Sequence, residues 1–114
     1  MNIRQADINE IENFPLFDSE NDGASVIVVE NEAGDIVGYA QYTDGMDDAI
    51  IYFMESAVKG VGRLIIEWFQ TNYEMVTAHN AVETAQGFYA HFGFNDVRSN
   101  GWAGQVDMTW YAEE

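Results

Sequence analysis

The sequence contains no cysteine, one proline and only four lysine or arginine residues among its 114 residues. Without cysteine there can be no disulfide bond, no thiolate metal site and no cysteine nucleophile. No apolar run approaches the roughly 20 residues that a membrane-spanning helix needs. The N-terminus also lacks the basic-then-apolar order of a signal peptide. We therefore expect a cytoplasmic protein that makes no contact with a membrane.

Basic residues are scarce beside the acidic ones: 20 Asp and Glu face four Lys and Arg, for a net charge of −16. Such a surface repels nucleic acid and anionic membranes, so we expect no direct binding to nucleic acid. It attracts cationic amines and basic proteins instead. Three explanations of the acidity stay open: solubility, adaptation to a saline interior, and mimicry of nucleic acid to occupy a DNA-binding partner.

Apolar residues are nonetheless plentiful, at 47% hydrophobic and 14% aromatic. A disordered chain has far fewer of them. A chain of this length forms one domain around one core. No repeat, low-complexity tract or linker divides it, so we expect a single domain over residues 1–114.

Short runs of β-branched and aromatic residues predict strands. The runs at 24–30 and 36–43 flank a turn at Gly34 and Asp35, which favours a hairpin. The run at 49–54 is apolar on both faces and indicates a central strand. Further strands are expected at 2–6, 75–79, 94–98 and 105–111, the last two around a turn at 100–104, and the polar stretch 13–23 around Pro15 is typical of a loop.

Two segments have the apolar spacing of a helix instead. The first is an amphipathic stripe at 61–69, formed by Val61, Leu64, Ile65, Trp68 and Phe69. On its other side Arg63 and Glu67 lie four residues apart and can pair. The second segment, 81–91, ends at Gly93 as helices commonly do, and its expected inner residues are Ala85, Phe88, Tyr89 and Phe92.

A short helix is also expected after Asp7, because Glu10 three residues later completes the pattern of a capping box. Ile8 and Ile11 give that helix one apolar side. The expected order is therefore β-α-β-β-β-α-β-α-β-β. It predicts a mixed α/β (α+β) domain with helices on both faces of one sheet.

The junction at 55–63 carries the strongest functional signal, because a central strand leads through Gly60 and Gly62 into an amphipathic helix. A glycine turn at a helix start leaves backbone N–H groups free to bind a phosphate or pyrophosphate. Two of the four basic residues, Lys59 and Arg63, fall in this turn. The spacing lacks the third glycine of a dinucleotide fingerprint and the Gly-Lys-Ser/Thr ending of a P-loop, so a plain glycine turn stays open as an alternative.

This turn resembles the coenzyme A pyrophosphate loop of GNAT-type N-acetyltransferases, Arg/Gln-x-x-Gly-x-Gly/Ala, at residues 57–62. A second stretch, 85–94, is similar to the family segment Ala-x-x-Phe-Tyr-x-x-x-Gly-Phe. The element order and the opening 2–6 also match, so the resemblance covers nearly the whole chain. Two positions depart from the family pattern: Ala57 stands where arginine or glutamine is usual, and Val82 where asparagine is frequent.

The resemblance implies a GNAT-like acyl-CoA N-acyltransferase fold, with a mostly antiparallel central sheet that holds acetyl-CoA in the opening of a splayed strand pair. The strand before the turn would polarise the thioester carbonyl with its backbone N–H groups. The residues implied in binding the cofactor are Tyr52, Phe53, Met54, Val58, Lys59, Gly60, Val61, Gly62, Arg63 and Phe88.

For catalysis, the resemblance implies that Tyr89 protonates the leaving thiolate. The alternative is a packed tyrosine whose hydroxyl bonds to the backbone. Glu55 is our candidate for the base, with Asp48 and Glu30 as alternatives that the spacing does not separate. His79 and His91 are further candidates for proton relay, His91 being more typical of a surface residue, and their spacing does not indicate a metal site. Trp102, Trp110 and Tyr111 are typical of core and edge packing.

The function implied is an acetyl-CoA-dependent N-acetyltransferase that acts on a primary amine of a cationic small molecule or a basic protein. The alternative is an inactive GNAT-like acidic binding protein, such as a viral decoy or inhibitor of a DNA-binding or other basic partner. An enzyme whose acidity reflects only a saline habitat is a third hypothesis. A homodimer paired through the late strands is also implied.

Overall fold

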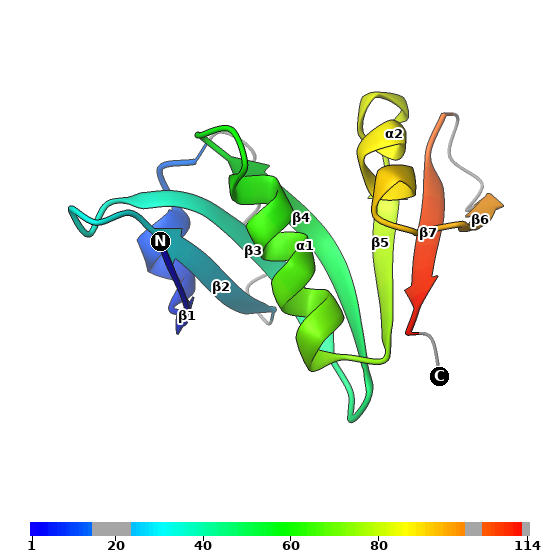
Figure 1. The fold of residues 1–114 in the computed structure, drawn as a ribbon, viewed down its shortest axis with the longest axis horizontal. Helices are drawn as coiled ribbons and strands as arrows, with labels where there is room; N and C mark the ends of the chain where they lie inside the picture. Colours follow the sequence, from blue (N-terminus) through cyan, green and yellow to red (C-terminus); the bar gives the residue numbers. More distant parts are fainter. Residues whose placement is uncertain (15–23, 100–103, 113–114) are drawn as a thin grey trace.

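The computed structural model describes residues 1–14, 24–99 and 104–112. It has one seven-stranded sheet, in the spatial order β1-β2-β3-β4-β5-β7-β6, with two α-helices and one 3-10 helix (Figure 1). The elements are β1 (Asn2–Ala6), η1 (Ile8–Ile11), β2 (Ser25–Glu30), β3 (Ile36–Asp44), β4 (Asp48–Ser56), α1 (Val61–Asn72), β5 (Met75–Ala81), α2 (Glu83–His91), β6 (Asp96–Ser99) and β7 (Val106–Tyr111). The expected order of elements is thus confirmed.

All neighbouring strands pair antiparallel except β4 and β5, which are parallel. This exception follows from the connection, because α1 carries the chain from the end of β4 back to the start of β5. The run at 49–54, expected to be central, lies in β4, the middle strand of the sheet. The turn at 100–104 and the loop at 13–23 fall mostly outside the described residues.

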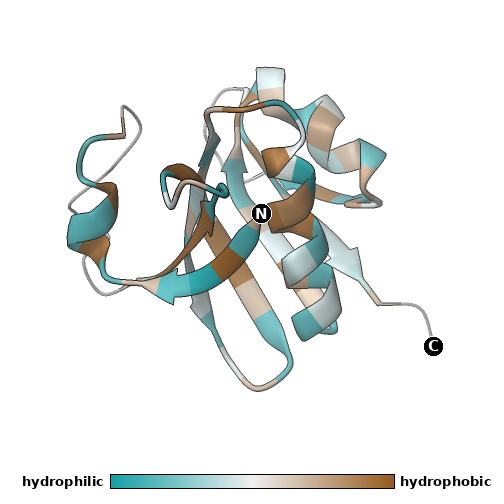
Figure 2. Cartoon of the chain, turned by 60° about the vertical axis from the view of Figure 1, so that its left-hand side comes forward, coloured by the Kyte–Doolittle hydropathy of each residue, from teal (hydrophilic) through white to brown (hydrophobic). Residues whose placement is uncertain are grey.

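Apolar side chains cover both faces of the sheet. On one face the buried side chains of β2 to β5 and β7 pack against α1 and α2, and on the other Val26, Val28 and Tyr39 pack against Ile11 of η1. Figure 2 shows η1 on one side of the sheet, with α1 and α2 on the other. Helices on both faces were expected, but the N-terminal one is a single 3-10 turn. Its capping box at Asp7 and Glu10 is present.

Helix α1 lies close to β3 because Gly38 has no side chain. A Cβ there would lie 2.4 Å from Val61 Cγ1 and 3.1 Å from the Glu55 carbonyl oxygen. The expected stripe of α1 is partly wrong: Leu64 is exposed, and Ile66 is fully buried in its place. The helix is rotated so that Gly62 and Ile66, rather than Leu64, flank the central row of Val61, Ile65 and Phe69.

The second α-helix begins later than expected, at Glu83, because Ala81 still pairs with Val106 as part of β5. Its expected inner side is confirmed: Tyr89 is buried, and Ala85, Phe88 and Phe92 pack partly buried against the same cluster. None of the helices in the described parts of the chain is long and apolar enough to cross a membrane.

Candidate active site

The parallel pair β4–β5 is only half formed. Its last pair is Ile51 with Ala78, although both strands continue, to Ser56 and Ala81. Beyond that pair the two strands diverge, as Figure 1 shows, while β4 stays paired with β3 up to Ser56. Within the described residues, the β5-facing edge of β4 from Tyr52 onward therefore has no partner strand. This gap is the splayed strand pair that was expected.

A β-bulge lies at the point where the gap opens. Gln41 of β3 pairs with Phe53, and the next residue, Tyr42, pairs with Ile51, so Tyr52 is the extra residue. The bulge shifts the alternation of β4. Ile51 and Met54 both pack on the α1 face, whereas Phe53 packs on the η1 face. A bulge of this kind ends regular pairing and re-aims side chains next to it.

The start of α1 is a set of backbone donors without a side-chain cap. Gly60 precedes the helix with φ +91°, a left-handed conformation that suits glycine. The Val61 N–H donates to the Val58 carbonyl at 3.2 Å. Within the described part of the chain, the N–H groups of Gly62 and Arg63 have no acceptor. Free N–H groups at a helix start form an anion site.

Basic side chains flank these donors. Lys59 is exposed and, among the described residues, makes no ion pair. Arg63 pairs with Glu67 as expected, at 3.2 Å, and its side chain is 70% exposed. So exposed a pair costs little to break, and Arg63 can turn toward an anion at the helix start.

Phe88 brings α2 against the same helix start. A Cβ on Gly62 would lie 3.2 Å from Cζ of Phe88, so the glycine allows the aromatic ring to lie close to the backbone of α1. Figure 1 shows the start of α1 and helix α2 at the same end of the sheet, on either side of the gap. The expected cofactor residues thus gather in two places, the open part of β4 and the turn before α1, with Phe88 beside the turn.

Tyr89 is the most buried of the candidate catalytic residues, at 8% exposure. Burial raises its pKa to about 12, because the charged phenolate is disfavoured away from water. Its ring contacts Phe88 and Phe94, each with centroids 5.4 Å apart. The alternative of a hydroxyl bonded to backbone is not found: within residues 1–14, 24–99 and 104–112 this hydroxyl has no hydrogen-bond partner.

The three carboxylates considered as the base lie in different places. Glu55 lies on the open part of β4, and its Oε1 accepts a hydrogen bond from the Tyr39 hydroxyl at 3.0 Å. Asp48 begins β4 at the closed end, paired with Met75. Glu30 accepts from Arg4 Nε at 2.7 Å, between β1 and β2. Of the three, only Glu55 lies near the gap.

His79 also lies at the gap, and it contacts a residue that the sequence did not single out. Its Nδ1 is 3.1 Å from Oδ1 of Asp107 on β7, and its ring lies 5.6 Å from that of Tyr52. The signal for Asp107 was the one carboxylate in the mostly apolar strand β7. His91 is exposed on α2, as expected. Among the described residues, no three His, Cys, Asp or Glu side chains could hold a metal ion.

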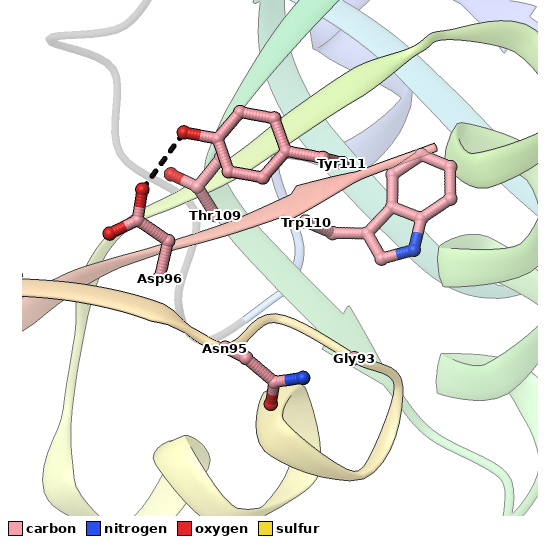
Figure 3. A pocket seen from close by; sticks show the side chains of 6 residues that line it. All are labelled: Gly93, Asn95, Asp96, Thr109, Trp110 and Tyr111. Carbon is pink, nitrogen blue, oxygen red and sulfur yellow. Dashed lines mark hydrogen bonds between the residues drawn. The ribbon is translucent and has the colours of Figure 1, made fainter. Parts of the chain in front are cut away.

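An open hollow of about 530 Å³ lies elsewhere, between β6, β7 and the end of α2 (Figure 3). The Tyr111 hydroxyl donates to Asp96 Oδ2 at 2.8 Å on its rim. Trp110 packs against the core, and Tyr111 is half exposed at the sheet edge, as expected of both. Trp102 lies outside the described residues. The hollow is separated from the gap by β5, so we do not assign the cofactor to it.

No family model and no curated protein matches the sequence. Solved structures match the fold. The ribosomal-protein-S18-alanine N-acetyltransferase from Escherichia coli superposes with a TM-score of 0.67 at 16% identity, over 99% of this chain and 94% of its own. Tetrahymena GCN5 gives 0.69 at 14%, over 93% and 86%. Naa20 from Chaetomium thermophilum, solved with a bisubstrate analogue, gives 0.59 at 13%, over 98% and 87%. The chain therefore has the fold of the GNAT N-acetyltransferases.

Proposed function

We propose that this protein is an N-acetyltransferase that moves an acetyl group from acetyl-CoA to a primary amine. The observation that carries the proposal is the conjunction of two openings at one end of the sheet. One is the unpaired edge of β4 beyond Ile51, and the other is the uncapped start of α1. Either feature alone occurs in many proteins, but together they offer backbone donors for both the pyrophosphate and the thioester end of a long anionic thioester.

The residues present fit acetyl-CoA. The N–H groups of Gly62 and Arg63, with the Lys59 ammonium, would hold the pyrophosphate. The free backbone groups of β4 between Tyr52 and Met54 would bond the pantetheine arm and polarise the thioester carbonyl. When bound, acetyl-CoA supplies an activated acetyl group with a good leaving thiolate. The solved structures of similar fold support this assignment, since the Escherichia coli protein is named as an N-acetyltransferase.

We infer that Tyr89 is the general acid. Its hydroxyl is buried, carries a proton at neutral pH with a pKa raised to about 12, and can donate that proton as the thiolate leaves. Within the described residues the hydroxyl makes no hydrogen bond that would compete with its bond to the thiolate. The role of Glu55 as proton acceptor stays a prediction. Its carboxylate accepts a hydrogen bond from the Tyr39 hydroxyl.

The acceptor is a cationic amine, on a small molecule or on a basic protein. A net charge of −16 steers such substrates toward the protein and repels nucleic acid. The bacterial relative acts, by its name, on an alanine of a ribosomal protein, which is an amine on a protein. Pairing of two copies through β6, an edge strand of the sheet, stays a prediction, as does a cytoplasmic location.

Calorimetry with acetyl-CoA tests the proposal directly. The wild type should bind acetyl-CoA, and Lys59→Glu should weaken binding at least tenfold, because the change places a carboxylate beside the pyrophosphate. Arg98→Glu on β6 is the matched control, since it alters the net charge equally but lies away from the turn. Equal affinity in Lys59→Glu and the wild type would rule the site out. Gly60→Glu should behave like Lys59→Glu.

A second candidate is an inactive acidic binding protein. It is favoured by Ala57 and Val82, which are both exposed and offer no polar group where the family pattern has one. A pull-down at low and moderate salt distinguishes the two. Retention of a DNA-binding or other basic protein, together with no effect of acetyl-CoA on the melting temperature, would support the binding protein. The reverse pattern supports the enzyme.

A further inference from the structure

The gap between β4 and β5 has an apex, the point where the two strands stop pairing, and the first unpaired residue of each strand lies there. Ile51 and Ala78 form the last parallel pair, and the next residues along the strands are Tyr52 and His79. Their rings meet edge to face with centroids 5.6 Å apart. His79 therefore lies where the two strands begin to separate, at the inner end of the opening proposed for the thioester.

A carboxylate fixes the orientation of the His79 ring. Asp107 Oδ1 is 3.1 Å from Nδ1 of His79, a hydrogen-bond distance. An ionised carboxylate accepts hydrogen bonds and cannot donate one, so this contact favours the tautomer with the proton on Nδ1. The remaining nitrogen, Nε2, then presents a lone pair. This is the tautomer that a proton acceptor requires.

The backbone of β5 is shaped to make this contact. The register between β5 and β7 shifts between Ala78 and Ala81, which leaves His79 and Asn80 in a bulge. Asn80 has φ +54°, a left-handed conformation that asparagine adopts more readily than most residues with a side chain. Its N–H donates to the same Oδ1 of Asp107 at 3.0 Å. One carboxylate oxygen thus holds both the bulge and the imidazole, which ties the position of His79 to β7.

The His79 side chain is also accessible. It is 38% exposed, and Asp107 is 33% exposed. The titratable groups that contact the imidazole, within the described residues, are Tyr52 from β4 and Asp107 from β7. The neighbouring contact between the same two strands is a hydrogen bond of 3.0 Å between the hydroxyls of Thr77 and Thr109, which pair in the sheet. The side chains of His79 and Asp107 are therefore half-buried, and both remain accessible to solvent.

We propose that His79 accepts the proton of the attacking amine, with Asp107 as the positioning residue. The inference rests on the proposed function. As the amine nitrogen forms its bond to the acetyl carbon, its proton passes to Nε2 of His79, directly or through one water. The bond from carbon to sulfur breaks, and the thiolate takes the Tyr89 proton. Tyr89 is reprotonated and His79 loses its proton to solvent, so the products are amide, free thiol and one proton from the ammonium substrate.

Asp107 makes this transfer easier in two ways. It holds Nε2 as the free nitrogen, and its negative charge stabilises the imidazolium formed when the proton arrives. Glu55, the acceptor expected from the sequence, lies on the open part of β4, where its Oε1 accepts a hydrogen bond from the Tyr39 hydroxyl. The imidazole of His79 thus lies at the apex of the gap with a carboxylate beside it. Glu55 is the alternative acceptor against which it is tested below.

Imidazole spectroscopy provides a test that needs no acceptor. The chain has two histidines, so 15N-labelled protein gives two sets of ring signals, and His91 is an internal control. We expect His79 to show the Nδ1–H tautomer and to shift on addition of acetyl-CoA, while His91 keeps its signals. A His79 ring in the opposite tautomer, or one that does not respond when acetyl-CoA binds, would overturn the inference.

Kinetics then tests the chemistry, with spermidine and an oligolysine peptide as probe amines and thiol release as the signal. His79→Gln should lower kcat about 100-fold and leave the affinity for acetyl-CoA within twofold of the wild type. The loss should shrink at high pH, where hydroxide can accept the proton in place of the imidazole, and added imidazole should partly restore His79→Ala. Asp107→Asn should cost about tenfold, and His91→Gln should cost nothing.

The outcomes separate this inference from the proposed function. Failure of the wild type to bind acetyl-CoA, or to acetylate either probe, overturns both. Binding and transfer that persist in His79→Gln overturn only the inference. So does a loss that occurs in Glu55→Gln but not in His79→Gln. A His79→Gln defect that high pH does not relieve, or that comes with weaker acetyl-CoA binding, indicates a structural role and also overturns it.

Discussion

At the scale of single residues, the Tyr89 hydroxyl is the clearest case of a group whose surroundings suit a reaction. It is buried, protonated at neutral pH, raised in pKa to about 12 by burial, and unbonded within the described residues. We expect Tyr89→Phe to lower kcat about tenfold to 100-fold without changing the affinity for acetyl-CoA. Since the hydroxyl has no described partner to lose, the melting temperature at pH 7.5 should stay within about 2 °C. Steady-state thiol release and thermal melts measure both, and an unchanged kcat would remove Tyr89 from the mechanism.

The same raised pKa predicts a dependence of stability on pH. An unfolded tyrosine loses its proton near pH 10, whereas folded Tyr89 keeps it up to about pH 12. Between these values the folded state binds more protons, so its stability falls as the pH rises. Urea unfolding at pH 9 and pH 11 should show a smaller loss in Tyr89→Phe than in the wild type. An identical loss in the two proteins would mean that Tyr89 titrates normally.

Sequence patterns located some of these residues and not others. Tyr89, Gly60 and Gly62 could be found because each belongs to a local motif with fixed spacing. Asp107 could not, since its contact with His79 depends on a bulge and on the register between two strands far apart in the chain. Leu64 was expected to be buried but is exposed, because apolar spacing in the sequence does not decide which residues at the border of the apolar face of α1 are buried.

At the scale of elements, the close contact of α1 with β3 depends on Gly38. Gly38→Ala would put a Cβ 2.4 Å from Val61 Cγ1 and 3.1 Å from a backbone oxygen that cannot move easily. We expect a loss of about 1–3 kcal/mol in unfolding free energy, measured with urea. Acetyl-CoA affinity should fall as well, because Val61 is the first residue of α1, whose start is the proposed pyrophosphate site. A variant as stable as the wild type would show that α1 can shift without cost.

Gly87 is the matched control for that substitution. It lies exposed inside α2, and a Cβ there would meet no atom within 4 Å. Gly87→Ala should therefore stabilise the protein by about 0.5–1 kcal/mol, the usual gain of alanine over glycine in a helix. A loss of stability here would mean that α2 is more crowded than the structure shows.

The order and type of the elements could be predicted because local apolar periodicity determines them. The gap could be expected only through resemblance to a family. Its physical origin is the bulge at Tyr52, which ends the pairing of β4 with β5 after Ile51. Nothing in the run 49–54 marks Tyr52 as an extra residue, because a bulge depends on the strand opposite. The 3-10 form of η1 was missed for a similar reason, since four residues are too few to show a helical period.

At the scale of the whole molecule, the acidity opposes the proposed cofactor. Coenzyme A carries several negative charges, and it must approach a protein of net charge −16. Lys59 and Arg63 act over a few ångströms at the helix start, whereas most of the carboxylates act from farther away. Salt weakens interactions beyond the Debye length, about 10 Å at 0.1 M, more than it weakens close contacts. Added salt should therefore remove more repulsion than attraction.

We expect the Kd of acetyl-CoA to fall several-fold between 50 mM and 500 mM KCl, as measured by calorimetry. This is the opposite of the usual behaviour of an anion at a basic site, where salt weakens binding. The cationic substrate should respond in the other direction, because its attraction comes from the same distant charges; the KM for spermidine should rise over this range. Melting temperatures across the series separate a change in binding from a change in folding. A Kd that rises with salt would mean that the two basic residues at the turn dominate the field at the site, and that the remaining acidic surface is too far away to influence the cofactor.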